Sequence, residues 1–461
     1  MDLLSTQNRE FLDFDPPSQQ DTCAYFHTGG TTGLPKLAKH SHLNQLTNGA
    51  QVNLISPAEP GDTIFVGLPI FHVNAAVATG IAPIMNRSKI LLASPAGYRG
   101  KNIISHLPDL IEGFQVGLMM AVPTVYSSLL LELEKNSLAS EKLQSLKLAI
   151  SGAAPLSSEL KKQFISKSGV NLIEGYGLTE SSSVCTLMPV KNINKKESVG
   201  LKIPGMTLKI LSFSEQNNEV MECSNDQVGE IVINGNNVFS GYVENIHNEN
   251  LFVEYEGRRY IRTGDLGSLD EHGYLSLAGR QKEIIIRGGH NIDPKMIEDI
   301  AYQHPLVSLA AAVPKPDTYA GEVPVLYVTP TSDSDKERLQ KEITVFMKDR
   351  TPERAAIPKE VLVIGEMPLT AVGKIFKPKL VCDQITAVIN AHLTDILKSE
   401  DYIVQTSPTK KRGIFSVIHL QAYLSKELVE KVEDKLTPFA FQYQIEIQNN
   451  NKSTHIEATT L

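Results

Sequence analysis

The chain has 461 residues, of which 41% are hydrophobic and 21% charged, and a formal net charge of −8. This composition is typical of a soluble globular protein, and the length predicts two or three domains rather than one core. The acidic balance gives no general basic surface for nucleic acid.

The cysteines and the N-terminus indicate the cellular compartment in which the protein is expected. Four cysteines lie far apart with no C-x-x-C pair, which argues against structural zinc and against a disulfide framework. The first ten residues have no basic region followed by an apolar core, so no signal peptide is expected. The longest apolar patch, residues 73–85, is interrupted by Asn74 and too short to span a bilayer. We therefore expect a cytoplasmic protein without a transmembrane segment.

The first feature along the chain is the sequence His-Thr-Gly-Gly-Thr-Thr-Gly-Leu-Pro-Lys at residues 27–36. Glycine lets the main chain come close to a ligand, and successive N–H groups can form a nest for anions. This is not a Walker loop, because the residues after Lys36 alternate like a strand. The pattern predicts a hairpin connection, entered by a strand at residues 23–26. The loop suits nucleotide phosphates, and a turn without ligand is the alternative.

Strands then alternate with helices. Ser41 can cap a helix over residues 42–55. A small-residue helix follows Asn74, and another helix is expected at 125–134. Apolar strands are expected at 63–69, 89–93, 116–122 and 146–150. This alternation predicts an α/β sheet with crossover connections, in which ligands gather beyond the strand ends.

The second half predicts three further parts. Residues 199–260 read as a β-rich subdomain and 260–279 as a hairpin. Asp293 caps and Pro294 starts a helix over 295–303, and alternation continues to about residue 380. The tail reads as a small α+β unit with a helix over 426–436 and strands at 402–405, 415–420 and 442–447. The expected domains are residues 1–279, 280–380 and 381–461.

Two segments after the sheet strands carry chemical groups. Residues 174–180 place Tyr176 beside glycines, where its face can meet a planar base, and Glu180 where a carboxylate can hold Mg²⁺ against phosphates. A strand-end turn with Thr179 as a helix cap is the alternative. Asp265 ends a predicted strand and suits two ribose hydroxyls, although a solvated turn aspartate is equally compatible.

Basic residues and one histidine complete the candidates. Arg280 and Lys282 form a basic pair that an ordinary charged linker also explains. Lys374 follows a glycine and is a point charge able to bridge two negative groups, although most lysines are surface residues. His72 could gate an apolar pocket, but a satisfied core histidine is favoured from sequence alone.

These motifs, in this order over residues 25–379, resemble the adenylate-forming (AMP-binding) superfamily of acyl-CoA synthetases, adenylation domains and luciferases. The wording of residues 27–36, 287–294 and 371–378 looks closest to the fatty-acyl-CoA synthetase-like branch. The resemblance implies a large α/β domain, N-terminally truncated, with a β-rich subdomain, then a smaller mobile α+β domain and a terminal α+β appendage. It also implies an acid–thiol ligase that activates a carboxylic, here fatty, acid with ATP and Mg²⁺ as acyl-AMP and transfers the acyl group to coenzyme A.

The resemblance also implies individual roles. Lys374, Thr179 and Glu180 would be catalytic, with Lys374 bridging the carboxylate and the α-phosphate and Glu180 binding Mg²⁺. His72 and Val73 would lie at the acyl pocket. Lys282 would be the hinge, and Gly288 and Gly289 would line the coenzyme A tunnel. The implied ATP and AMP contacts are Thr28, Gly29, Gly30, Thr31, Thr32, Gly33, Lys36, Gly152, Ala153, Ala154, Glu174, Gly175, Tyr176, Gly177, Thr179, Asp265, Arg280 and Lys374.

The position of the phosphate loop departs from the family pattern. The loop begins within forty residues of Met1, where the family has a substantial upstream segment. We therefore expect part of the first subdomain, and of the acyl pocket, to be missing and apolar faces to be exposed. Two alternatives follow. One is an acyl-AMP ligase that loads a carrier protein. The other is an inactive remnant or nucleotide-binding subunit completed by an upstream polypeptide.

Overall fold

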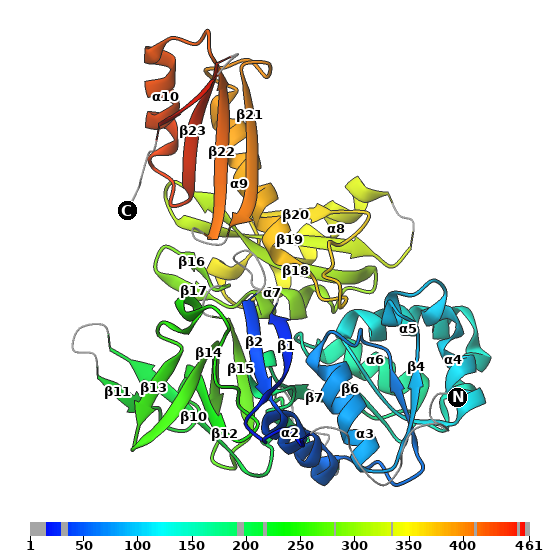
Figure 1. Cartoon of the computed structure of the whole chain (residues 1–461). Coiled ribbons are helices and arrows are strands. Elements are labelled where there is room, and N and C mark those ends of the chain that lie inside the picture. Colours follow the sequence, from blue (N-terminus) through cyan, green and yellow to red (C-terminus); the bar gives the residue numbers. More distant parts are fainter. Residues whose placement is uncertain are drawn as a thin grey trace.

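A computed structural model describes residues 15–28, 36–190, 198–214, 219–280, 283–332, 335–409, 413–449 and 452–456. The described residues form five sheets, grouped as a large first part, a smaller second domain and a terminal unit that extends away from both (Figure 1). Within the described part of the chain, no helix is both long and apolar enough to cross a membrane.

The N-terminal hairpin is confirmed. Strand β1 (Thr22–Thr28) pairs antiparallel with β2 (Lys36–Ser41), with Thr28 opposite Lys36. The loop between them, residues 29–35, lies outside the described residues. Helix α2 (His42–Ile55) starts at Ser41, whose side chain accepts a hydrogen bond from the Asn44 N–H, as the cap predicts.

A seven-stranded sheet forms the first half of the large part, in the order β4-β3-β5-β6-β7-β8-β9. The first five of these strands are parallel, and β8 and β9 continue the sheet antiparallel. This confirms the predicted α/β architecture. The strands are β3 (Thr63–Val66), β4 (Lys89–Leu92), β5 (Val116–Ala121), β6 (Leu148–Ser151), β7 (Leu172–Tyr176), β8 (Thr186–Leu187) and β9 (Leu201–Lys202).

Crossover helices cover this sheet, and Tyr126 and Phe164 from two of them meet edge to face in its core. The small-residue helix is a π-helix, η1 (Asn74–Ile81), continued by α3 (Ala82–Met85). Helices α2 and α3 expose several large apolar side chains, which are Leu46, Leu54, Ile84 and Met85. The remaining helices are η2 (Gly97–Arg99), α4 (Ile103–Phe114), α5 (Pro123–Lys135), η3 (Ser137–Leu143), α6 (Ser158–Ser168) and η4 (Thr179–Ser181).

The β-rich half is a six-stranded sheet in the order β11-β10-β12-β14-β13, with β15 paired to β14. The predicted hairpin at 260–279 is β14–β15, and its register places Asp265 opposite Arg280. The elements are β10 (Met206–Phe213), β11 (Val220–Glu222), β12 (Gly229–Gly235), η6 (Asn245–Asn248), β13 (Phe252–Tyr255), β14 (Arg258–Leu269) and β15 (Leu275–Arg280).

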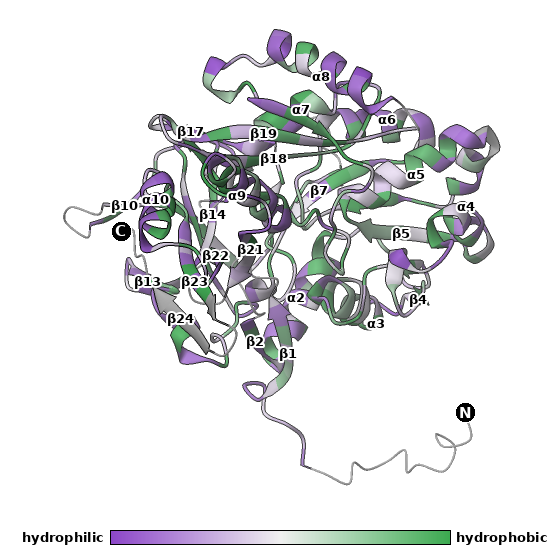
Figure 2. Cartoon of the chain, turned by 90° about the horizontal axis from the view of Figure 1, so that it is seen from above, coloured by the Kyte–Doolittle hydropathy of each residue, from purple (hydrophilic) through white to green (hydrophobic). Residues whose placement is uncertain are grey.

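The second domain is a five-stranded sheet in the order β17-β16-β19-β18, with β20 parallel to β19. Asp293 caps α7, accepting from the Lys295 N–H at 2.9 Å, and Pro294 opens the helix as predicted. Helix α8 carries mostly hydrophilic residues at the rim of the molecule (Figure 2). The elements are β16 (Ile285–Arg287), β17 (His290–Ile292), α7 (Pro294–Ala301), β18 (Val307–Asp317), β19 (Gly321–Pro330), α8 (Lys336–Arg350), η7 (Arg354–Ala356), β20 (Glu360–Val363) and α9 (Lys377–Leu393).

Helix α9 joins the second domain to the terminal unit. Leu380, near its start, packs in the second-domain core, whereas Ile389 and Leu393 pack with the terminal sheet. The predicted boundary at residue 380 therefore falls inside a continuous helix. The terminal α+β unit is present, with strands in the order β21-β22-β23-β24. Its elements are β21 (Tyr402–Thr409), β22 (Gly413–Gln421), α10 (Lys426–Leu436), β23 (Gln442–Asn449) and β24 (Lys452–Ile456).

Candidate functional site

Three predicted site residues share one hydrogen-bonded cluster at the carboxyl edge of the first sheet. Tyr176 ends β7, and its hydroxyl donates to Asp265 Oδ2 at 2.7 Å. The other oxygen, Asp265 Oδ1, lies 3.1 Å from Arg280 Nε. Burial raises the pKa of Tyr176 well above its usual range, so the phenol stays protonated and keeps donating. Asp265 is thereby held rigidly, with lone pairs left for further donors.

A second cluster lies where the N-terminal hairpin meets the turn η4. Glu180 accepts a hydrogen bond from the hydroxyl of Tyr242, and the Lys36 ammonium lies 5.0 Å from the centroid of the Tyr242 ring. His40 Nε2 contacts the Thr179 carbonyl oxygen at 2.8 Å. Burial lowers the pKa of His40 to about 4, so the neutral ring donates from Nε2 to that carbonyl. The hairpin and the turn are thus fixed to each other.

Sequence reasoning missed both His40 and Tyr242. A period-two pattern along β2 places Lys36, Ala38 and His40 on one face, which is the only sequence signal that would have marked His40. Tyr242 follows Gly241 outside any regular strand, and its contacts join segments far apart in the sequence. Nothing local to the sequence marks it.

The loop that carries Lys374 is docked on the first domain. It is a tight turn in which the Thr370 N–H donates to Lys374 O at 2.7 Å and Gly373 has φ +84°. The Gly373 carbonyl accepts from Thr124 Oγ1 at 2.8 Å, and the Thr370 carbonyl accepts from Arg99 Nη1 at 3.1 Å. Lys374 is therefore held over the strand ends of the first sheet rather than exposed on an open surface.

The charges around Lys374 place it in the same site as the two clusters. Burial against the first domain, followed by the positive charge of Arg280, lowers the pKa of Lys374 to about 8. The carboxylates of Asp265 and Glu180 act in the opposite direction. The charges at positions 180, 265 and 280 therefore all act on Lys374, and a shared site remains what the family resemblance implies.

His72 lies beside this group and is partly exposed rather than enclosed in the core. Its Nδ1 accepts from the Asn74 N–H at 3.3 Å, which leaves the proton on Nε2. Burial, followed by the charges of Lys374 and His27, lowers the pKa of His72 to about 3, so the ring is neutral. His72 is thus partly exposed and close enough to Lys374 for that charge to lower its pKa, and its place at the acyl pocket stays a prediction. Val73 is buried directly before η1.

For several residues predicted to contact the nucleotide, the structure also shows local packing or backbone constraints. A Cβ on Gly177 would lie 1.7 Å from Ser183 O, so the chain packing itself requires glycine. A Cβ on Gly152 would lie 3.4 Å from Gly175 O on β7, so the loop after β6 contacts the neighbouring strand there. Glu174 lies 3.9 Å from Lys161 on α6. Ala153 has φ +69° in the loop with Ala154 after β6.

The remaining predicted residues fall elsewhere. Gly288 and Gly289 form the exposed turn between β16 and β17, with φ of +55° and +85°. Thr28 is the last residue of β1, at the start of the loop predicted to bind phosphates. The remaining predicted loop residues and the residue predicted as the hinge lie outside the described residues, and these are Gly29, Gly30, Thr31, Thr32, Gly33 and Lys282.

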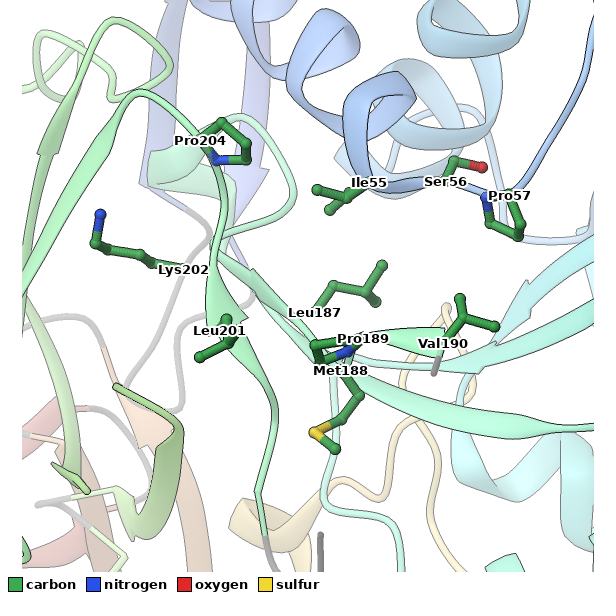
Figure 3. Close-up of a pocket in the computed structure, with 10 residues that line it drawn as sticks. All are labelled: Ile55, Ser56, Pro57, Leu187, Met188, Pro189, Val190, Leu201, Lys202 and Pro204. Carbon is green, nitrogen blue, oxygen red and sulfur yellow. The ribbon is translucent and has the colours of Figure 1, made fainter. Parts of the chain in front are cut away.

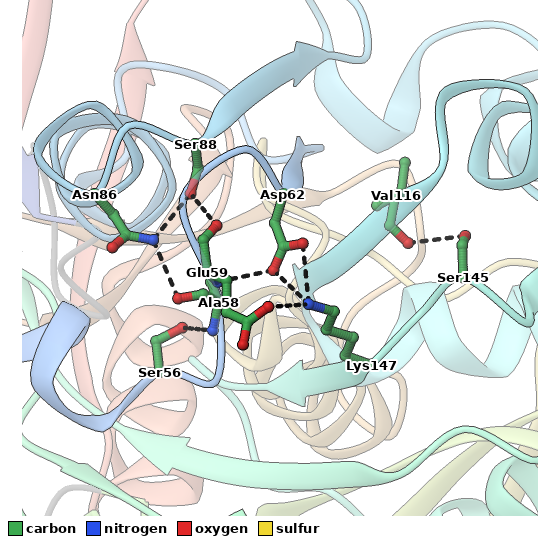
Figure 4. Close-up of polar contacts among 9 residues, drawn as sticks. All are labelled: Ser56, Ala58, Glu59, Asp62, Asn86, Ser88, Val116, Ser145 and Lys147. Carbon is green, nitrogen blue, oxygen red and sulfur yellow. Dashed lines mark hydrogen bonds and ion pairs between the residues drawn. The ribbon is translucent and has the colours of Figure 1, made fainter.

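Two other features lie away from this site. A pocket of about 420 Å³ opens between the end of α2 and strands β8 and β9, and none of the predicted site residues lines it (Figure 3). At the amino ends of β3 and β6, Lys147 pairs with Asp62 at 2.9 Å and with Glu59 at 3.4 Å (Figure 4). This is the edge of the sheet opposite to the site, so the ion pairs tie strand starts together.

Solved structures share this architecture. ATP-bound MatB from Rhodopseudomonas palustris is 26% identical with a TM-score of 0.70, covering 82% of this chain and 71% of that chain. MenE, the o-succinylbenzoate CoA synthetase from Bacillus subtilis, was solved with its acyl-adenylate intermediate. It is 25% identical with a TM-score of 0.65, covering 82% of this chain and 73% of that chain. The fold is that of the adenylate-forming enzymes.

Family comparison agrees with the fold. The family model for AMP-binding enzymes matches residues 3–243, and the model for the C-terminal domain of AMP-binding enzymes matches residues 296–374. The chain belongs to the AMP-binding enzyme family, which confirms the resemblance read from the sequence.

Curated relatives are named CoA ligases. The marinolic acid–CoA ligase of Pseudoalteromonas sp. (strain SANK 73390) is 36% identical over 421 residues, 90% of this chain and 63% of that protein. The long-chain-fatty-acid–CoA ligase of Bacillus subtilis (strain 168) is 32% identical over 371 residues, 78% of this chain and 62% of that protein. The chain spans less than two thirds of the length of these two relatives.

Proposed function

We propose that the chain carries the adenylate-forming site of an ATP-dependent acyl-CoA synthetase, an AMP-forming acid–thiol ligase. The observation that carries this proposal is the convergence of Lys374 with Asp265, Arg280 and Glu180 at one sheet edge. Attack of a carboxylate on the α-phosphorus develops charge on oxygens that are already anionic, so fixed cations and N–H donors supply the main stabilisation. Lys374 is the cation that the second domain brings to that point.

Each residue of the site has a proposed role. Asp265, held by Tyr176 and Arg280, accepts from the ribose hydroxyls. Lys374 bridges the substrate carboxylate and the α-phosphate. Lys36 and the loop before it hold the outer phosphates, and Thr179 contacts phosphate at the same turn. Residues 152–154 border the base.

Glu180 fits a role as a magnesium ligand. Mg²⁺ is commonly held by one or two carboxylates together with substrate phosphates, and Glu180 supplies one carboxylate beside the phosphate-loop lysine. Tyr242 binds Oε1, which leaves Oε2 for the ion. A bound Mg²⁺ would neutralise phosphate charge during attack.

The acid and the acceptor are proposed from the sequence motifs and the relatives. A fatty acid is the proposed substrate, because residues 27–36, 287–294 and 371–378 resemble the fatty-acyl-CoA synthetase-like branch and because one relative is the long-chain-fatty-acid–CoA ligase of Bacillus subtilis (strain 168). Coenzyme A is the proposed acceptor, reached when the second domain turns about Lys282 and presents Gly288 and Gly289. The free cysteines, Cys185 and Cys382 among them, fit a cytoplasmic setting.

The test is acid-dependent exchange of labelled pyrophosphate into ATP, with fatty acids of several lengths and the acids named for the relatives. We expect exchange with at least one acid, lost in Asp265→Asn. Asp401→Asn is the matched control, because Asp401 also accepts from a phenol, that of Tyr423 at 2.6 Å, in the terminal unit. Absence of exchange with every acid would point to the inactive-remnant alternative, and a product formed only on a carrier protein would replace coenzyme A as acceptor.

A further inference from the structure

Tyr242 is fixed on the strand that carries Lys36. The Lys39 N–H donates to Gly241 O at 3.1 Å, and the Val243 N–H donates to Leu37 O at 2.9 Å. Tyr242 and Ala38 form an antiparallel bridge between these two bonds. The segment 241–243 is therefore attached to β2 of the N-terminal hairpin through a single antiparallel bridge.

The ring of Tyr242 is held on two sides. The ring of Phe239 meets it edge to face with centroids 5.0 Å apart, and the Tyr242 N–H donates to Asn248 Oδ1 at 2.8 Å. Ala38, fully buried, leaves room for the ring, and Lys36 lies two residues away on the same strand face. With its Nζ 5.0 Å from the ring centroid, Lys36 is within cation–π distance.

The hydroxyl of Tyr242 contacts a carboxylate, whereas its ring contacts an ammonium group. It donates to Glu180 Oε1, while the backbone at Glu180 is anchored separately because its carbonyl accepts from the Phe239 N–H at 2.9 Å. Burial, followed by the charge of Glu180, raises the pKa of Tyr242 far above its usual range. The phenol therefore stays protonated at neutral pH and can donate to Glu180.

We propose that Tyr242 is a positioning residue that holds the Lys36 ammonium with its ring face and the Glu180 carboxylate with its hydroxyl. One rigid side chain thereby sets where the phosphate-binding cation and the magnesium-binding carboxylate lie relative to each other. The proposal rests on the proposed function, because Lys36 and Glu180 take these ligands only if the site binds MgATP. The proposal predicts two separate effects. The hydroxyl of Tyr242 acts on Mg²⁺ binding through Glu180, and its ring acts on phosphate binding through Lys36.

Two substitutions separate these effects. Tyr242→Phe keeps the ring and removes the bond to Glu180, whereas Tyr242→Leu removes both. Groups that orient a metal ligand typically contribute about 10- to 100-fold in metal affinity. In Tyr242→Phe we expect the Mg²⁺ concentration for half-maximal ATP binding to rise about tenfold. Its ATP dissociation constant at saturating Mg²⁺ should stay within about twofold of wild type, and only Tyr242→Leu should weaken that constant further.

The measurement is calorimetric ATP binding at a series of Mg²⁺ concentrations, beside pyrophosphate exchange and thermal unfolding. Tyr423→Phe is the matched control, since it removes a phenol–carboxylate bond of the same kind from the terminal unit. An unchanged Mg²⁺ requirement in Tyr242→Phe, or an equal shift in Tyr423→Phe, overturns the proposal. If Tyr242→Leu does not fold, Tyr242→Phe alone decides, because its ring packing is preserved.

Failure of the proposal is distinguishable from failure of the proposed function. A wild-type chain that binds MgATP with a Mg²⁺ requirement insensitive to Tyr242→Phe overturns only the role of Tyr242. A wild-type chain that neither binds ATP nor exchanges pyrophosphate overturns the proposed function, and the role of Tyr242 with it.

Discussion

The docking of the second domain should depend measurably on one hydroxyl. Thr124 Oγ1 donates to the carbonyl of Gly373 at 2.8 Å, directly beside Lys374. Thr124→Val removes that hydroxyl at nearly constant volume. A typical hydrogen bond contributes about 1 kcal/mol net, and an unpaired buried carbonyl costs up to about 3 kcal/mol. Since 1.36 kcal/mol is a factor of ten, the ratio of docked to undocked domain should fall about fivefold, and at most about 160-fold.

The assay is single-turnover adenylate formation, compared with thioester formation from supplied acyl-adenylate. We expect Thr124→Val to slow the first reaction by that factor and leave the second unchanged, because only the first requires Lys374 in its docked position. Thr344→Val is the matched control, as Thr344 Oγ1 donates to the Gln340 carbonyl at 2.7 Å within α8, away from the interface. An equal slowing of both reactions, or none in the first, would refute the reasoning.

Three further outcomes follow from the site. Tyr176→Phe should weaken ATP binding about tenfold without changing the Mg²⁺ requirement, because the lost hydrogen bond of 2.7 Å orients Asp265. An unchanged ATP affinity with a raised Mg²⁺ requirement, measured by calorimetry, would instead place Tyr176 at the metal. Because the pKa of Lys374 is about 8, its charged fraction falls as pH rises through 8. ATP affinity should therefore fall above pH 8, by at most about tenfold per pH unit, as for the loss of one proton. An ATP affinity that stays constant from pH 7 to 9.5 would count against this prediction. The pKa of His40 is about 4 in the folded chain against an ordinary 6.5, so the unfolded chain takes up this proton first as pH falls. The free energy of unfolding should therefore be constant with respect to this group above pH 6.5 and fall by about 3 kcal/mol as pH falls towards 4. His40→Gln, which keeps a donor for Thr179, should flatten that loss in thermal unfolding, and an unaltered acid slope would contradict it.

Locally encoded elements were predictable from sequence. Ser41 set the start of α2, and the pair Asp293-Pro294 set the start of α7, because caps depend on adjacent residues alone. The sequence does not predict helix α4 (Ile103–Phe114). It holds Pro108 in its interior, where proline normally breaks a helix, so its local sequence hides it. Strand β24 is polar and has no apolar alternation to mark it.

For the candidate site, the sequence motifs supply candidate residues, and their roles stay predictions. Asp265, Arg280 and Lys374 were each ambiguous alone, and the fold brings them together from three segments. His40 and Tyr242 are not predicted from the sequence, because their hydrogen-bond partners, Thr179 and Glu180, lie far away along the chain. No local pattern encodes such a pairing, and only the tertiary structure reveals it.

The central claim is that a nucleotide is held at the first-domain site while Lys374, carried by the second domain, acts on its α-phosphate. The most direct measurement compares the two half-reactions of Lys374→Ala by rapid quench. We expect adenylate formation to fall by roughly 10²–10³, as for loss of one preorganised charge-stabilising group, with thioester formation from supplied acyl-adenylate retained. Equal loss of both half-reactions, or retained adenylate formation, would contradict the claim.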